Sequence, residues 1–574
     1  MSSPCPLPVD SNAHPTDEDR RVRQFRQTLL WPLRLMSAEA AEGGASARPW
    51  QQLRELGESC PWQELVDEYS GPGGRFRERH YNEFVTFLPM VQRFLYGEGR
   101  GASTAGARAA SADAVADSPM RVFRRRDIAQ ARVWLRDAQR PEAAITLDVI
   151  HLDLYFFYDV DLVLLNLEVA ARDLPLPVAQ ELMYRFGRGY PPGWEADGQP
   201  QHCLAAAEWL DAAGRVLERS DAEQSELFMA HVAAQRAPRL AQHWAYLLQP
   251  LVSASSPEPG PLRFRQVETY RMPLMAYLAL DRPQDLTRAD FLHLGQIAGA
   301  GAADACAGEP VADAAWAEFE RRHCVDRFWG GSGIAPHTRY LCTGHAMVVL
   351  GDAQSDFFRC AQRGVLAQFR HQHFLVFLIA HFQKAALLMF SDRLVEVLAR
   401  LDVGDAASVR RFKRAIRANF EGFLRFTHRY WFHEVSEQVH VRTLFRMQAE
   451  QLGVDALYRE VKERIADMSD YLEADGIRRQ ANTVVRLTVV TIFGLIGTIT
   501  TGFLGMNLLA EAESPLTERL AYFALVFGVS TALTLYTMVK SKRLSDFLDA
   551  VSDERLSTWN KLRALAAVWR RGAD

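Results

Sequence analysis

This 574-residue sequence has few cysteines, no excess of charge of either sign and no secretory leader. Its seven cysteines include no C-x-x-C pair, which argues against a disulfide framework or structural zinc and favours reduced thiols in a cytosol. A net charge of −4 gives no basic footprint for nucleic acid. Residues 1–20 are polar and proline-rich, without the apolar segment of a signal peptide.

The residue patterns of common enzymes are also missing. The sequence contains no phosphate-binding loop, no G-x-S-x-G turn, no H-E-x-x-H pattern and no kinase motif set. The nearest glycine-rich segment, residues 330–333, has no following Lys-Ser/Thr pair and is typical of a turn. We therefore expect neither an enzyme nor a bound organic cofactor.

Long uncharged runs are rare, but two occur near the C-terminal end. Residues 487–506 and 520–539 are each 20 residues long and carry no charge. At about 1.5 Å of rise per residue, a helix of this length crosses a hydrocarbon core of about 30 Å. A third apolar run, residues 374–382, is too short to span and predicts a buried helix segment. The sequence therefore predicts a transmembrane hairpin that follows a large aqueous part.

The charges around the two runs predict the orientation of this hairpin. Basic residues precede the first run and follow the second, and the connecting loop at 507–519 is acidic. The basic residues are Arg478, Arg479 and Arg486 before the hairpin and Lys540, Lys542 and Arg543 after it; the acidic ones are Glu511, Glu513 and Glu518. Because Lys and Arg favour the cytoplasmic side, we expect both termini in the cytoplasm and the loop outside.

Composition and periodicity divide the chain into segments. We expect an α/β cytoplasmic domain, long stalk helices and a C-terminal two-helix hairpin. The predicted segments are 1–20 (disordered), 21–96 (helical), 97–118 (a flexible linker), 119–355 (the α/β domain), 356–486 (long helices), 487–506 and 520–539 (transmembrane helices), 507–519 (the outer loop) and 540–574 (a basic, amphipathic tail). Within them we expect strands at 145–169, 263–270 and 338–350, and long helices at 356–401, 405–452 and 455–506.

Small and hydroxylated residues recur on one face of the first uncharged run. They are spaced by three or four positions: Thr488, Thr491, Gly494, Thr498, Thr501 and Gly505. Such a stripe can let membrane helices pack closely. It can also line a water-filled path through a ring of identical subunits, where the hydroxyls solvate a hydrated cation. The spacing alone leaves both explanations open.

The tripeptide Gly505-Met506-Asn507 ends the first run, ahead of the short acidic loop. With the basic cluster after the second run, this arrangement resembles the CorA metal-ion transporter family, over residues 477–542 most closely. The resemblance implies a homopentamer in a bacterial inner membrane, with a cytoplasmic funnel and a pore lined by the five first helices. It implies transport of Mg²⁺, or in some relatives of Co²⁺ or Ni²⁺.

The resemblance also implies roles for individual residues. Asn507 would form a ring at the outer mouth that holds a hydrated ion, with Gly505 and Met506 supporting it, and the loop glutamates would concentrate cations there. By counting from the motif, Leu495, Leu487 and Val484 match apolar constrictions of the pore in relatives, and Thr498 matches a polar ring. Thr491, from the same stripe, is expected to line the pore as well. Asp470 lies at the matching distance from the motif for a regulatory Mg²⁺ site, with Asp467 and Glu473 near it on the same predicted helix, and carboxylates suit this ion. A solvated acidic helix face is the alternative for these three residues.

Two other functions remain open at this stage. Histidines are ligands for Zn²⁺, Ni²⁺ or Co²⁺, and a transporter of these ions, with or without proton coupling, would use His371, His373, His381, His428, His433 or His440. None of them lies in the uncharged runs. The hairpin could instead be a simple tether for a cytoplasmic sensor. The enlarged N-terminal part and the tail beyond Arg543 both depart from the family pattern.

Overall fold

The computed structural model describes residues 20–36, 49–65, 78–97, 119–135, 144–268, 270–299, 313–330, 332–402 and 405–505, with short stretches between 515 and 536. The chain divides into two compact units, residues 1–463 and residues 464–574. The predicted disordered segment (1–20) and linker (97–118) lie almost entirely outside the described residues, and the predicted tail (540–574) lies wholly outside them.

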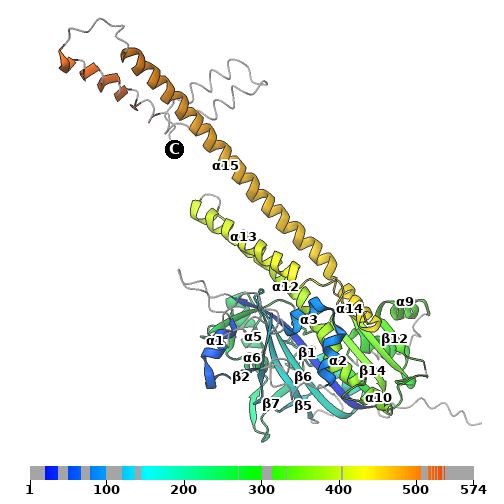
Figure 1. The fold of residues 1–574 in the computed structure, drawn as a ribbon. Coiled ribbons are helices and arrows are strands. Elements are labelled where there is room, and N and C mark those ends of the chain that lie inside the picture. The colour runs from blue at the N-terminus through cyan, green and yellow to red at the C-terminus, as the bar shows by residue number, and fades with distance from the viewer. Residues whose placement is uncertain are drawn as a thin grey trace, which may run out of the picture. The chain divides into compact units, whose positions relative to one another are not determined.

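A mixed sheet of fourteen strands forms the centre of the first unit (Figure 1). Its main path runs β12-β13-β14-β11-β1-β6-β5-β4-β7-β8. Neighbours are antiparallel except for two parallel pairs, β11 with β14 and β9 with β10. The strands are β1 (Arg21–Met36), β2 (Trp62–Glu64), β3 (Met120–Arg125), β4 (Gln130–Trp134), β5 (Ile145–Phe157), β6 (Leu162–Pro175), β7 (Ala206–Leu210), β8 (Val216–Arg219), β9 (Leu251–Ser253), β10 (Leu262–Gln266), β11 (Leu274–Leu280), β12 (Cys324–Phe328), β13 (Thr338–Thr343) and β14 (Ala346–Asp352).

The longest strand, β1, corrects the prediction of a helical segment at 21–96. Residues Arg21–Met36 pair with β6, β11 and β10 and hold the centre of the sheet. Gln27 to Leu35 are buried without interruption, so both faces of the strand are covered. Such a strand loses the alternation of apolar and polar residues that distinguishes a strand from a helix. The helical prediction holds further along, at α1 (Pro49–Glu55), α2 (Glu78–Thr86) and α3 (Pro89–Tyr96).

The other strand predictions are confirmed, with closer bounds. Residues 145–169 form β5 and the first part of β6, and residues 338–350 form the hairpin of β13 and β14. The segment at 263–270 contains β10. Apolar β11, with the sequence LMAYLAL, was not predicted; it is buried throughout and lies between β1 and β14.

Helices cover both faces of the sheet. Phe156 of β5 packs with the apolar side of β1 and with α4 (Leu176–Arg185) and α6 (Gln242–Leu248) in one core. Its neighbour Phe157 points to the opposite face, as successive strand residues do, and stacks on Phe382 of α12 (Phe374–Ala399) at 4.0 Å between ring centroids. Shorter elements complete the first unit: α5 (Ser225–Gln235), α7 (Arg288–Gln296), α9 (Asp313–His323) and the 3₁₀ turns η2 (Gly57–Ser59) and η5 (Pro283–Asp285).

The three long helices predicted after residue 355 are confirmed in part. The first is divided into α10 (Asp356–Arg359), α11 (Val365–Gln368), the π-helix η6 (Phe369–His373) and α12. The second is α13 (Ala406–Arg429) followed, after a break, by α14 (Val439–Gln451). Asp405 caps α13 as expected, because its carboxylate accepts the backbone N–H groups of Ala407 and Ser408. The break follows Tyr430, whose hydroxyl donates to Asp159 at 2.6 Å.

Among the described residues, one helix is long and apolar enough to cross a membrane by length and composition. It is Val365–Ala399, and 78% of its most apolar window is buried inside the protein. The core helix of a water-soluble domain has these same properties. The prediction of a buried helix at 374–382 is confirmed, because Leu375 to Phe382 are all buried.

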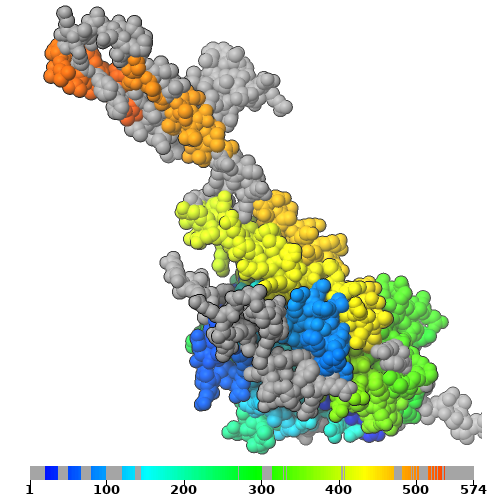
Figure 2. All heavy atoms as spheres, in the orientation of Figure 1, coloured from blue at the N-terminus to red at the C-terminus, as the bar shows by residue number. Residues whose placement is uncertain are grey.

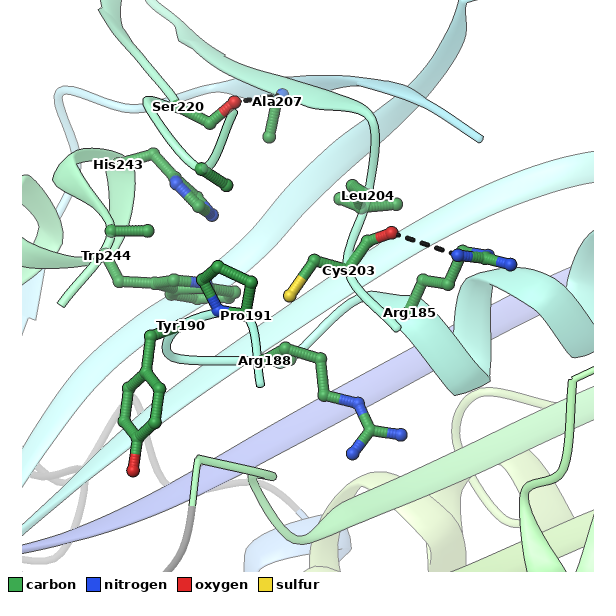
Figure 3. A pocket seen from close by; sticks show the side chains of 13 residues that line it. Arg185, Arg188, Tyr190, Pro191, Cys203, Leu204, Ala207, Ser220, His243 and Trp244 are labelled. Atoms are coloured by element: carbon green, nitrogen blue, oxygen red, sulfur yellow. Dashed lines mark hydrogen bonds between the residues drawn. The ribbon is translucent and has the colours of Figure 1, made fainter. Parts of the chain in front are cut away.

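An enclosed pocket beneath the sheet holds a buried histidine (Figure 3). Its cavity volume of about 10 Å³ leaves room for about one water molecule. The His243 ring packs against Trp244 and Trp209, and its Nδ1 atom has no hydrogen-bond partner among the described residues. Burial lowers the pKa of the His243 imidazole to about 4 and raises that of the nearby Cys203 thiol to about 12. Both groups are therefore neutral at pH 7.

The low pKa of His243 predicts acid sensitivity of the first unit. The unfolded chain, with a histidine pKa of about 6.5, binds more protons than the folded chain between pH 6.5 and 4. This contribution to stability is present above pH 6.5 and is lost as pH falls to 4, by about 3 kcal/mol. We expect the unfolding midpoint of His243→Leu to vary less across this window than that of the wild type or of exposed His428→Leu. Equal pH dependence in all three would contradict this.

Candidate functional site

The candidate ion path lies along helix α15 (Val454–Gly505), a continuous helix of 52 residues. It begins after Gly453, whose φ of 65° suits a glycine, and Asp455 lies in its first turn rather than at the expected capping position. At 1.5 Å per residue the helix is about 78 Å long. The prediction that the stalk continues without a stop into the first uncharged run is confirmed as far as Gly505, where this described stretch of the chain ends.

The predicted pore positions share one face of α15. At 100° per residue, the five positions fall within about 80° of arc. They are Val484, Leu487, Thr491, Leu495 and Thr498. Val484 and Leu487 are 56% and 67% exposed, and the two threonines are exposed as well, whereas the side chain of Leu495 lies outside the described residues. Val489, about 160° around the helix, is only 2% exposed. Val489 was not singled out from the sequence. Its position opposite the predicted pore face is the feature that could have identified it as buried.

The threonines of the small-residue stripe bond back to their own helix. Each hydroxyl donates to the carbonyl oxygen four residues earlier: Thr488 to Val484 at 2.9 Å, Thr491 to Leu487 at 2.8 Å, Thr498 to Gly494 at 2.9 Å and Thr501 to Gly497 at 2.9 Å. This bond satisfies the hydroxyl donor inside the helix. The oxygen lone pairs remain, so the stripe offers hydrogen-bond acceptors rather than donors.

The glycines of this segment do not serve close packing among the described residues. A Cβ atom added at Gly494 or Gly502 would have no neighbour within 4 Å. Close helix packing in a membrane brings another backbone against such positions. If the stripe packs at all, its partner therefore has to be a segment outside the described residues or a second copy of the chain.

The described residues after 514 form helical turns with an apolar surface. A helical turn at 516–518 lies inside the predicted outer loop, so the helix starts earlier than the predicted residue 520. Glu518 is exposed in this turn. Large apolar side chains in this stretch are also exposed: Leu516, Leu520, Tyr522, Leu525, Val529 and Tyr536. An exposed apolar surface of this kind marks contact with lipid or with another protein.

Several residues of the predicted site lie outside the described part of the chain. They are Met506 and Asn507 of the motif, Glu511 and Glu513 of the loop, and Lys540, Lys542 and Arg543 after the hairpin. The functions assigned to these residues remain predictions from the sequence.

The acidic residues predicted to bind a regulatory ion lie on α15 ahead of the first uncharged run. Asp467 and Asp470 are exposed, and neither has an ion-pair partner among the described residues. Glu473 lies on the same helix, with its side chain outside the described set. Within the described residues, no three His, Cys, Asp or Glu side chains come together as a metal site. Asp467 and Asp470 alone make no such group, so an ion held here would need ligands from side chains outside the described set or from a second copy.

The histidines proposed for a softer metal are dispersed. His381 is buried next to Phe377, and burial holds the pKa of its imidazole well below the usual value. His373 and His440 pack edge-on at 5.2 Å between centroids, with Tyr340 beside them. His371 pairs with Glu83, and His428 and His433 are exposed. In the described part of the chain these rings fill a core or face solvent, and they do not gather as a ligand set.

Comparisons with known proteins found no match for this chain. No protein-family model, no curated protein and no solved structure matches the chain.

Proposed function

We propose that this protein is a divalent-cation channel of the CorA type, most suited to Mg²⁺, with no catalytic reaction. Residues 487–506 and 520–539 form a transmembrane hairpin in a bacterial inner membrane, with both termini in the cytoplasm. Five copies assemble around the first helix, and the sheet unit forms a cytoplasmic funnel. The choice of ion, the location in the membrane and the pentameric state are all proposed from the resemblance around the G-M-N motif.

The observation that carries the proposal is the exposed face of α15. Val484, Leu487, Thr491 and Thr498 share this face and are exposed in the single chain, whereas Val489 on the opposite side is buried. Four of the five threonines in this run lie on this face or beside it, Thr488, Thr491, Thr498 and Thr501, and Thr500 lies opposite it. A ring of copies places this face toward a common axis, where hydroxyls and water meet.

The chemistry of the stripe suits a hydrated cation. Mg²⁺ gives up its water reluctantly, so a path for it has to accept hydrogen bonds from the bound water molecules. The oxygens of Thr491 and Thr498 are acceptors, because their hydrogens are already donated to the helix backbone. Rings of Val484 and Leu487 form apolar constrictions, which close a pore by excluding water.

The first prediction concerns the outer mouth. In proteoliposomes containing an internal Mg²⁺-sensitive dye, the wild-type protein should admit Mg²⁺ down an imposed inside-negative potential. Asn507→Ala removes the amide oxygens that hold the hydrated ion, so the rate should fall at least about tenfold, equivalent to about 1.4 kcal/mol. Thr517→Ala, in the exposed helical turn at 516–518, is the matched control and should conduct like the wild type.

A wild-type protein that admits no Mg²⁺ under any imposed potential or internal Mg²⁺ level would contradict the channel. Equal rates for Asn507→Ala and the wild type would remove the assigned role of the motif.

The second prediction concerns regulation. If copies share Mg²⁺ through Asp467 and Asp470, millimolar Mg²⁺ should slow proteolysis of the assembled wild-type protein. Asp470→Ala removes one ligand and should abolish most of this protection. Glu450→Ala, which removes an exposed carboxylate from α14, should keep it. Unchanged protection in Asp470→Ala would mean that this carboxylate binds no regulatory ion.

A further inference from the structure

A polar cleft in the first unit lies between helix α2 and the short helices that lead into α12. Its volume is about 270 Å³, close to the lower end of the range for small-molecule sites, about 300–1,000 Å³. The walls come from α2, from the turn before α11, from the π-helix η6 and from the residue before α14. Figure 2 shows α2 and α3, in blue, at the surface of this unit beside the yellow residues that follow α13.

The lining of the cleft is rich in side-chain amides and basic groups. Arg79 and Arg363 bring two guanidinium groups, and five side-chain amides join them, including those of Asn82, Gln368 and Gln372. No carboxylate belongs to the described lining. Two guanidinium groups without a carboxylate between them favour an anionic occupant.

The π-helix fixes a histidine in the wall. Turns of this kind are rare and occur often at functional sites. The Nδ1 atom of His371 lies 3.1 Å from a carboxylate oxygen of Glu83, whose other oxygen accepts the hydroxyl of Tyr96 at 2.8 Å. The ring is therefore held in one orientation. Its Nε2 atom is buried and has no hydrogen-bond partner among the described residues.

Arg79 is the second group with an unused polar atom. One terminal nitrogen lies 2.9 Å from the His80 ring, and the buried Nε atom has no partner among the described residues. Buried polar atoms are usually hydrogen-bonded, so these two nitrogens are exceptions among the residues that line the cleft. A tetrahedral or planar group of anionic oxygens supplies the acceptor that a guanidinium binds with two bonds.

We propose that this cleft binds a small anionic metabolite through a phosphoryl or carboxylate group. Arg79 and Arg363 hold the anionic oxygens, and the amides and His371 bind the polar remainder of the molecule. No residue of α15 lines the cleft, so the site does not depend on the proposed ion path.

The test uses the purified full-length protein in detergent, in buffer freed of divalent cations by a chelating resin, so that neither these cations nor a soluble chelating anion takes part. Calorimetric titrations with pyrophosphate and with citrate distinguish a phosphoryl from a carboxylate ligand. We expect saturable binding of one of them with a Kd below about 1 mM, and a loss of at least about tenfold in Arg79→Gln. Gln368→Leu, which leaves the charge unchanged, should weaken binding as well.

The matched control is Arg417→Gln. Arg417 is exposed on α13 and does not line the cleft, so its loss should leave the affinity unchanged. Thermal unfolding without ligand identifies any variant that fails to fold, in which case Arg363→Gln takes the place of Arg79→Gln. The proposal is overturned if neither anion binds below about 1 mM. It is also overturned if the folded cleft variants bind like the wild type, or if Arg417→Gln weakens binding as much as they do.

Discussion

The apolar side chains of a long helix have to be covered, and the two longest helices differ in whether the single chain covers them. Helix α12 buries its apolar surface against the sheet, where Phe382 stacks on Phe157 at 4.0 Å. Helix α15 leaves Val484 and Leu487 exposed in the single chain. The first arrangement stabilises the core of the first unit. We interpret the second as a surface that lipid and other copies of the chain cover. The proposed function depends on this difference in burial, because composition alone does not distinguish the two helices.

Ion pairs, as well as apolar packing, hold helix α12 against the sheet of the first unit. Arg34 of β1 is buried and forms ion pairs with Asp392 and Glu396 of this helix, the latter at 2.7 Å. Burial alone would raise the pKa of the Glu396 carboxyl, but the bonds from Arg34 and Arg265 outweigh this and lower the pKa. The same helix follows directly from the π-helix that presents His371 to the polar cleft. The core helix and the wall of the proposed anion site are therefore consecutive elements of the chain.

Local sequence signals predicted the elements whose pattern depends on near neighbours. The β5–β6 hairpin, the cap at Asp405 and the continuity of α15 were predicted correctly. Strand β1 was missed because burial on both faces removes its alternation. The cleft could not be predicted, since its walls come from segments near residues 79–86, 362–372 and 438 that only the fold brings together. The outer mouth at Asn507 rests on the sequence resemblance, because it lies outside the described residues.

The central claim is that one face of α15 lines the ion path, and thiol modification tests it most directly. Thr491→Cys, Thr498→Cys and Val489→Cys proteins in liposomes would be treated with a positively charged methanethiosulfonate, and Mg²⁺ uptake measured before and after treatment. The wild type, with its own cysteines, is the control. We predict inhibition at Thr491→Cys and Thr498→Cys and unchanged uptake at Val489→Cys. Inhibition at Val489→Cys alone, or at none of the three, would contradict this account.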